Sequence, residues 1–369
     1  MAILVVLVLN LGALGANLFM QLRHAREPAV AAPPPAPVVD APPGGTTVAS
    51  PGTRDPGGSA SAVPVVAERG LHWHDAPLVT QVGGDETEDI VGLFSTTGDD
   101  GKLSFFVGAF DGATLSRLWR AGPIAIIDRG EKTPILQIVA GHLLAAESNT
   151  VHLYNVTNGD EKGTVHAADR VTELCAYGPD KSKAWARVDG GKNVAINVAL
   201  AETKALEAPP AGCWTPKGPK HETPAGSNFA PSKVLVDGDV GVALGVASPG
   251  TPVPTALGFD PKSKKVRWQK AIAEAEDPTS VVAAAGRIAE LTEGRLYASF
   301  RLQAGGWHFV AIDGKTGDHA WEVPIPDGNA SQGTVTVSPS RVYLFHGSWL
   351  DVFDKITGHQ AGTLGDHTP

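Results

Sequence analysis

The residues best suited to metal chemistry are the two histidines of the run His72-Trp73-His74-Asp75. Residues two apart on an extended strand share a face, so His72 and His74 could present two imidazoles to one metal ion. No third ligand follows at a spacing that would complete a coordination shell. We therefore interpret this run as the polar edge of a strand and expect no metal site.

Other signatures of chemistry are weak. No glycine-rich phosphate loop lies between a strand and a helix, so nucleotide binding has no support. Asn155-Val156-Thr157 matches the glycosylation sequon, but Asn155 also occupies a fixed position in an internal repeat, which favours a structural role. The net charge of −9 argues against a nucleic-acid partner, which would require an excess of basic residues.

A repeated phrase is the strongest pattern in the chain. Its clearest copy places Asp313, Thr316, Gly317 and Trp321 at fixed offsets, with the Trp eight residues after the Asp. Two other copies have the same offset, from Asp111 to Trp119 and from Asp260 to Trp268. A fourth copy contains Asp354, Thr357 and Gly358, and a fifth contains Asn155. The weakest copy starts at Val198, with Leu206 in the place of the Trp.

The chemistry of the phrase is that of a tight turn between two strands. The Asp side chain can accept hydrogen bonds from nearby backbone amides, glycine supplies a positive φ, and the Trp is suited to wedge between neighbouring sheets. Intervals of 41 to 62 residues between copies suit blades of four antiparallel strands. We predict an all-β propeller of about six four-stranded blades, with seven as the alternative, closed by pairing of the Leu71–Val82 region with the last blade.

The N-terminal part predicts an anchor and a tether. Residues 2–20 contain Asn10 and Asn17 as their only strongly polar side chains and would span ~28 Å as a helix. We therefore predict a transmembrane anchor over residues 1–22, with the lipid bilayer as its partner. Residues 23–68 are rich in Pro and Gly and predict a disordered linker, which leaves 69–369 for the propeller.

The phrase resembles the repeat of the pyrroloquinoline-quinone-like β-propellers, which follows an A-x-D-x-x-T-G-x-x-x-W layout. Ala311, Asp313, Thr316, Gly317 and Trp321 match all five elements, and the similarity covers roughly residues 69 to 365. The catalytic branch of that family binds calcium and the quinone within eight blades, beside a disulfide of adjacent cysteines. This chain is too short for eight blades, and its two cysteines are not adjacent.

The resemblance therefore implies the non-catalytic branch, without catalytic, cofactor-binding or metal-binding residues. We expect a membrane-tethered scaffold that binds or assembles protein partners, whose identity the sequence does not give. Two alternatives remain: a sensor or ligand-binding domain of a membrane protein whose N-terminal module lies upstream, and a quinone-dependent dehydrogenase.

Cys175 and Cys213 bracket the third repeat, and we predict a disulfide between them. Together with the usual location of the family, such a bond favours an extracytoplasmic propeller on a single-pass membrane protein. The basic residues Arg23, His24 and Arg26 after the anchor favour the opposite orientation under the positive-inside rule. We give more weight to the disulfide.

Overall fold

The computed structural model describes residues 65–67, 70–84, 87–128, 130–213, 229–247, 253–273, 281–283, 288–302, 306–325 and 332–365. Within these ranges the chain is built of β-strands, with one 3-10 turn, η1, at Asp189–Gly191. None of the described segments is a helix with the length and apolar character that a membrane span requires. The anchor predicted over residues 1–22 lies outside the described residues, as does nearly all of the linker.

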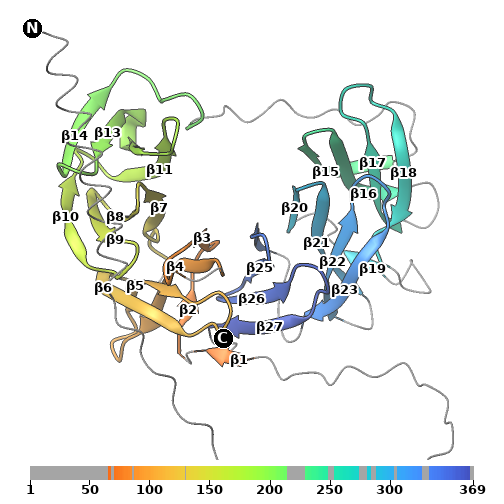
Figure 1. The fold of residues 1–369 in the computed structure, drawn as a ribbon, viewed down its shortest axis with the longest axis horizontal. Helices are drawn as coiled ribbons and strands as arrows, with labels where there is room; N and C mark the ends of the chain where they lie inside the picture. The colour runs from red at the N-terminus through yellow and green to blue at the C-terminus, as the bar shows by residue number, and fades with distance from the viewer. Residues whose placement is uncertain are drawn as a thin grey trace, which may run out of the picture. The chain divides into compact units, whose positions relative to one another are not determined.

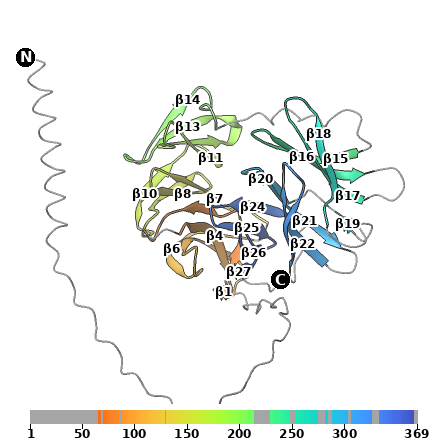
Figure 2. The same ribbon diagram turned by 45° about the vertical axis from the view of Figure 1, so that its right-hand side comes forward.

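Within the described residues, six mainly antiparallel sheets follow one another along the chain, and we call them blades 1 to 6 (Figures 1 and 2). In each of them the strands succeed one another as a meander, the arrangement found in the blades of a propeller. Blade 1 contains β2 (His72–Trp73), β3 (Leu78–Thr80), β4 (Asp89–Thr97), β5 (Leu103–Phe110) and β6 (Arg117–Ile127). Blade 2 contains β7 (Ile135–Val139), β8 (His142–Glu147), β9 (Thr150–Asn155) and β10 (Glu161–His166). Blade 3 contains β11 (Val171–Tyr177), β12 (Lys183–Val188), β13 (Asn193–Asn197) and β14 (Glu202–Leu206).

In the remaining blades the meander is similar, and in blade 5, as in blade 1, the first two strands both pair with the third. Blade 4 contains β15 (Phe229–Asp237), β16 (Val240–Ala247), β17 (Val253–Phe259) and β18 (Val266–Ala271). Blade 5 contains β19 (Val281–Ala283), β20 (Ala289–Thr292), β21 (Arg295–Leu302), β22 (Gly306–Asp313) and β23 (His319–Ile325). Blade 6 contains β24 (Gly333–Val337), β25 (Arg341–His346), β26 (Trp349–Asp354) and β27 (Gln360–Leu364), and β1 (Val65–Ala67) pairs with it.

The central strands of a blade are buried on both faces. In β22, Val310 and Ile312 pack into a core shared with blade 4, whereas Phe309 and Ala311 pack into a core shared with blade 6. A blade lies between two neighbours and must offer apolar side chains to both. This explains why the strand is almost continuously apolar.

Five hydrophobic cores join neighbouring blades. They lie between blades 1 and 2, 2 and 3, 4 and 5, 5 and 6, and 6 and 1. The sixth cluster, around Phe229, Leu257 and Phe259, contains residues of blade 4 alone. Among the described residues, no cluster of buried apolar side chains joins blade 3 to blade 4.

The first and last blades are connected by a strand that the sequence analysis placed in the linker. Residues Val65–Ala67 form β1, which pairs in parallel with β27, so the folded region begins before Arg69. The Leu71–Val82 region does not pair as a strand with blade 6; it forms β2 and β3, which pair with β4. It still contacts blade 6, because the N–H of Trp73 donates to the carbonyl of Ser348 at 2.7 Å.

Candidate functional site

The turn between the last two strands of each blade is built around one Asp or Asn side chain. In blade 5 the carboxylate of Asp313 accepts hydrogen bonds from the backbone N–H groups of Lys315 and Thr316, at 2.8 and 2.9 Å. The carbonyl of Asp313 accepts from Gly317, which closes the turn. The equivalent side chains in the other blades accept the same kind of bond: Asp111, Asn155, Asn197, Asp260 and Asp354.

At Asp111 and Asp260 these bonds favour the ionised form of the side chain. The backbone amide of Thr114 holds the pKa of Asp111 below its ordinary value, and the amide of Ser263 does the same for Asp260. A carboxylate that serves as a backbone acceptor in this way is unsuited to accept or deliver a proton near neutral pH. Asp111 and Asp260 therefore act as hydrogen-bond acceptors within their turns.

The weakest copy of the repeat was placed one residue too late. The turn of blade 3 is built around Asn197, whose Oδ1 accepts from Ala199 and Leu200, and Val198 is the next residue. The strand pair β13–β14 also lacks the bulge seen in the other blades, so Lys204, rather than Leu206, lies in the position of the repeat Trp. A signal was present, because Asn197 follows Asn155 by 42 residues, close to the spacing of the neighbouring copies.

The fourth residue after each Asp or Asn has a positive φ, and it is not always glycine. Its φ is +73° at Gly159, +72° at Gly317 and +71° at Gly358, but also +59° at Leu115, +52° at Ala201 and +59° at Lys264. The left-handed conformation therefore does not by itself explain why three blades have glycine there.

The repeat Trp of the preceding blade explains the difference. Trp119 of blade 1 packs over Gly159 of blade 2, where an added Cβ would lie 2.5 Å from the indole ring. Its Nε1 donates to the carbonyl of Val156 at 2.9 Å. Trp268 and Trp321 make the same two contacts with the turns of blades 5 and 6. Blades 1, 3 and 4 follow blades without a repeat Trp, so a side chain fits in their turns.

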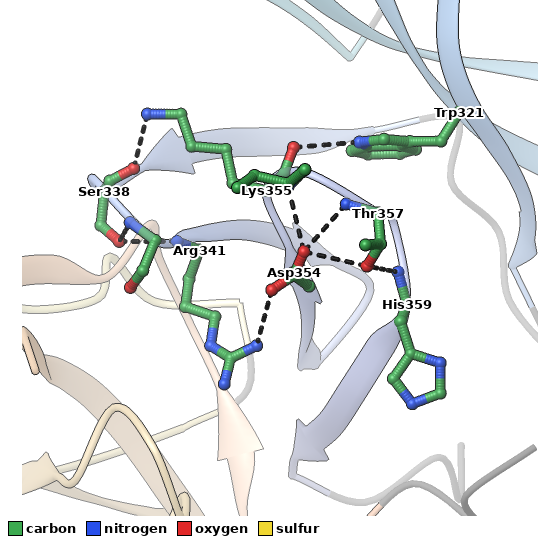
Figure 3. Close-up of polar contacts among 9 residues, drawn as sticks. Trp321, Ser338, Arg341, Asp354, Lys355, Thr357 and His359 are labelled. Carbon is green, nitrogen blue, oxygen red and sulfur yellow. Dashed lines mark hydrogen bonds and ion pairs between the residues drawn. The ribbon is translucent and has the colours of Figure 1, made fainter.

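Figure 3 shows this arrangement in blade 6. The carboxylate of Asp354 accepts from the backbone N–H and the hydroxyl of Thr357, at 2.8 and 2.9 Å, and forms an ion pair with Arg341 at 3.7 Å. Trp321 reaches across from blade 5 and donates to the carbonyl of Lys355 at 3.1 Å. The turn is thus held both by its own Asp and by the neighbouring blade.

The side chain of Lys355 adds a second link between the two blades. Its Nζ donates to the carbonyl of Ser338 within blade 6 at 2.9 Å and to the carboxylate of Glu293 in blade 5 at 2.6 Å. The guanidinium of Arg295, also in blade 5, donates to the carbonyl of Lys355 at 3.1 Å. The polar residues near this turn act as connections between blades.

His74 of the N-terminal run packs against an aromatic ring in the structure. The ring of His74 lies 4.5 Å from that of Phe105, centroid to centroid, and its Nε2 is 2.6 Å from the hydroxyl oxygen of Ser95. Burial, together with the charge of His72, lowers the pKa of His74 to about 4. No group of three or more possible metal ligands occurs within the described ranges.

Cys175 and Cys213 are joined by a disulfide, with their Cα atoms 5.6 Å apart. Cys175 lies on β11, the first strand of blade 3, and Cys213 lies beyond β14, the last strand. The segment that leaves blade 3, residues 207–213, is therefore held back against its own blade. The remainder of the connection to blade 4, residues 214–228, lies outside the described residues.

A surface hollow of about 510 Å³ lies on blades 2 and 3, at the end that carries the Asn155 and Asn197 turns. Sequence reasoning did not identify it, because its residues come from five separate stretches of two blades. His142 contributes from blade 2; Tyr177, Lys183, Asn197 and Ala199 contribute from blade 3. Leu200, the residue after Ala199, is 63% exposed.

No family model matches this chain, and the comparison with curated proteins found no match. Among solved structures it is similar to BamB from Moraxella catarrhalis, with 13% identity over 79% of this chain and 76% of that chain and a TM-score of 0.25. It is also similar to a europium-containing methanol dehydrogenase, with 10% identity over 79% and 78% of the two chains and a TM-score of 0.33. Since both scores are below 0.5, the assignment to the β-propellers rests on the sheet topology, the shared cores and the repeat.

Proposed function

We propose that this chain is a membrane-tethered, non-catalytic β-propeller that serves as a scaffold for protein binding or assembly. The observation that carries the proposal is the hollow beside the turn of blade 3, with the exposed Leu200 next to it. A concave surface next to an apolar side chain is a suitable contact for a protein partner.

The repeat residues support this function indirectly. The side chains of Asp313 and Asp354 and the ring of Trp321 are engaged in holding their turns and the neighbouring blades. The residues between them vary from blade to blade, as with Leu200 in blade 3 and Ile356 in blade 6, which is 79% exposed. A rigid frame with variable side chains lets one blade bind a partner without alteration of the others.

The proposed location is supported by the disulfide and by the apolar N-terminal sequence. A bond between Cys175 and Cys213 persists in an oxidising compartment, which supports a propeller on the extracytoplasmic side. The apolar residues 2–20 supply the proposed membrane tether, and residues 23–64 supply its length.

The test is cross-linking in native membranes followed by identification of the partner captured by the wild-type chain and by two variants. Leu200→Asp places a charge beside the hollow. Ile126→Asp is the matched control, because Ile126 is 60% exposed but lies on β6 at the end away from the Asp111 turn. We expect a specific partner to be lost with Leu200→Asp and kept with Ile126→Asp. Equal capture by the wild type and both variants would reject this surface as the binding site.

A further inference from the structure

The turn of blade 4 has more positive charge than any other turn of the repeat. Between β17 and β18, residues 260–267 contain one acid, Asp260, and four basic residues, which gives a formal net charge of +3. The corresponding residues of the other five blades, counted from the repeat Asp or Asn with His neutral, have formal net charges of 0 or −1. The basic residues of blade 4 are Lys262, Lys264, Lys265 and Arg267. This positive turn is an exception in a chain whose net charge is −9.

The backbone of this turn is fixed, and the positions of the basic residues are fixed with it. The carboxylate of Asp260 accepts hydrogen bonds from the N–H groups of Lys262 and Ser263, at 2.9 and 2.8 Å. The carbonyl of Asp260 accepts from the N–H of Lys264 at 2.8 Å. Pro261 restricts φ at the second position of the turn. A ligand would therefore meet basic residues on an ordered backbone, which lowers the entropic cost of binding.

The acidic side chains around the turn are already paired. Three carboxylates each form an ion pair with a basic side chain: Asp260 with Arg267 at 3.2 Å, Asp318 with Lys270 at 2.7 Å, and Asp239 with Lys315 at 3.2 Å. Lys262 and Lys265 are exposed, and neither forms an ion pair with another of the described residues. These two lysines are therefore available to a carboxylate from outside this chain.

An apolar side chain lies next to these lysines. Val266, the first residue of β18, follows Lys265 directly and is 39% exposed. Binding surfaces for proteins commonly combine an apolar contact with charged residues around it. Cations next to Val266 are therefore complementary to a segment that has carboxylates beside an apolar side chain.

The neighbouring blade favours a short acidic segment over a lipid surface. An anionic bilayer is broad and would approach the turn of blade 5 as well, which is joined to blade 4 through Lys270 and Lys315. That turn contains Asp313 and Asp318 and has a formal net charge of −1. The positive charge is thus confined to a single turn, whose extent matches a peptide rather than a membrane.

We propose that the turn of blade 4 binds an acidic segment of a protein partner. The carboxylates of the segment pair with Lys262 and Lys265, and an apolar side chain of the segment packs on Val266. This surface is separate from the hollow beside Leu200, and its binding of an acidic peptide does not depend on the proposed scaffold function.

The experiment measures the binding of a labelled peptide to the full-length chain in phosphatidylcholine nanodiscs by fluorescence anisotropy. The peptide is rich in glutamate, contains one leucine and has both ends blocked; its counterpart has glutamine in place of every glutamate. We expect saturable binding of the acidic peptide that weakens as the salt concentration rises, and no binding of its counterpart. Equal binding of the two peptides, or no binding of the acidic one, would overturn the proposal.

Three double variants test the assignment to this turn. Lys262→Gln with Lys265→Gln removes two cations, and we expect binding to weaken about tenfold. Lys262→Arg with Lys265→Arg keeps the charges and should bind as the wild type does. Lys102→Gln with Lys132→Gln is the matched control, because both lysines are exposed and lie beyond the end of blade 1 that is opposite the Asp111 turn. Equal weakening by the two glutamine variants would show general charge attraction and reject this turn as the site.

A lipid surface would be recognised by protection of the same lysines. Amine-reactive labelling of Lys262 and Lys265, measured by mass spectrometry, is compared between phosphatidylcholine nanodiscs and nanodiscs that also contain phosphatidylglycerol. We expect equal labelling in the two kinds of disc. Slower labelling of these two lysines in the anionic discs, with Lys132 unchanged, would identify the membrane as the ligand and overturn the proposal of an acidic segment.

Discussion

The contact between blades 1 and 2 and the connection between blades 3 and 4 are built in opposite ways. Blades 1 and 2 share a hydrophobic core, and Trp119 crosses to Gly159 and to the carbonyl of Val156. Blade 3 has Lys204 in the position of that Trp, and no core of described residues joins it to blade 4. Instead, a disulfide holds the segment that leaves blade 3 against its own first strand.

The difference shows that the repeat stabilises contacts between blades more than the blades themselves. A Trp in one blade requires glycine in the turn of the next, as with Trp321 and Gly358. Where the Trp is absent, the turn keeps its Asp or Asn but accepts a larger residue, as at Lys264 in blade 4. The residue type in each turn therefore depends on whether the preceding blade has a repeat Trp.

The largest effect should come from removal of a Trp that joins two blades. Trp119→Ala leaves a cavity between blades 1 and 2 and an unpaired carbonyl on Val156, so we expect a loss of about 3–5 kcal/mol in the free energy of unfolding. Trp321→Ala should cost a similar amount between blades 5 and 6. Chemical denaturation monitored by circular dichroism measures both. Wild-type stability in either variant would contradict the role given to the repeat Trp.

Loss of the disulfide should affect the other kind of connection. Cys213→Ser opens a loop that spans 38 positions, and we expect a loss of up to about 4 kcal/mol in the chain-entropy model. Hydrogen exchange should show the loss in blade 3, with the contact between blades 1 and 2 still protected. A uniform loss of protection over all blades would show that the two connections are not independent.

Substitution of the turn glycine should be costly only where a Trp covers it. Gly358→Ala combines a φ of +71° with a Cβ placed 2.5 Å from the ring of Trp321, so we expect a loss of roughly 2 kcal/mol or more. Lys264→Gly, in a turn without such a Trp, should change stability by less than about 1 kcal/mol. Equal effects of the two substitutions in thermal melts would remove the explanation of the glycine pattern.

Loss of the turn carboxylate should have a moderate effect. Asp313→Ala leaves the amides of Lys315 and Thr316 without their acceptor, at a cost of about 1–3 kcal/mol. Asp313→Asn keeps the acceptor oxygen, as Asn155 does in blade 2, and should retain most of the stability. A loss with Asn as large as that with Ala would show that the charge, rather than the hydrogen bonds, holds the turn.

The smallest effect on stability concerns the protonation of His74 at acidic pH. Because burial and the charge of His72 lower its pKa from 6.5 to about 4, the fold favours the neutral ring, and the unfolded chain binds the proton more readily. The contribution of His74 is complete above pH 6.5 and is lost as the pH falls toward 4. Melting temperatures over this range should fall less in His74→Gln than in the wild type. His359→Gln, at an exposed position, should follow the wild type.

Much of the frame could be predicted from the sequence because it depends on local chemistry. Asp111, Asp260 and Asp313 each precede turn residues within five positions, and the Trp that follows is at a fixed offset. Blade 3 was misplaced by one residue because its strands lack the bulge that sets this offset in the other copies.

What the sequence by itself determined was the repeat, and with it most strands and turns and an estimate of about six sheets, since these depend on hydrogen bonds between near neighbours and on apolar patterning. Only the tertiary structure decided which blades share a core, that β1 pairs with β27, and that Trp185, Arg187 and Asn193 line one pocket with Pro209. These depend on contacts between segments far apart in the chain, and no local pattern of residues specifies which distant face a side chain will meet.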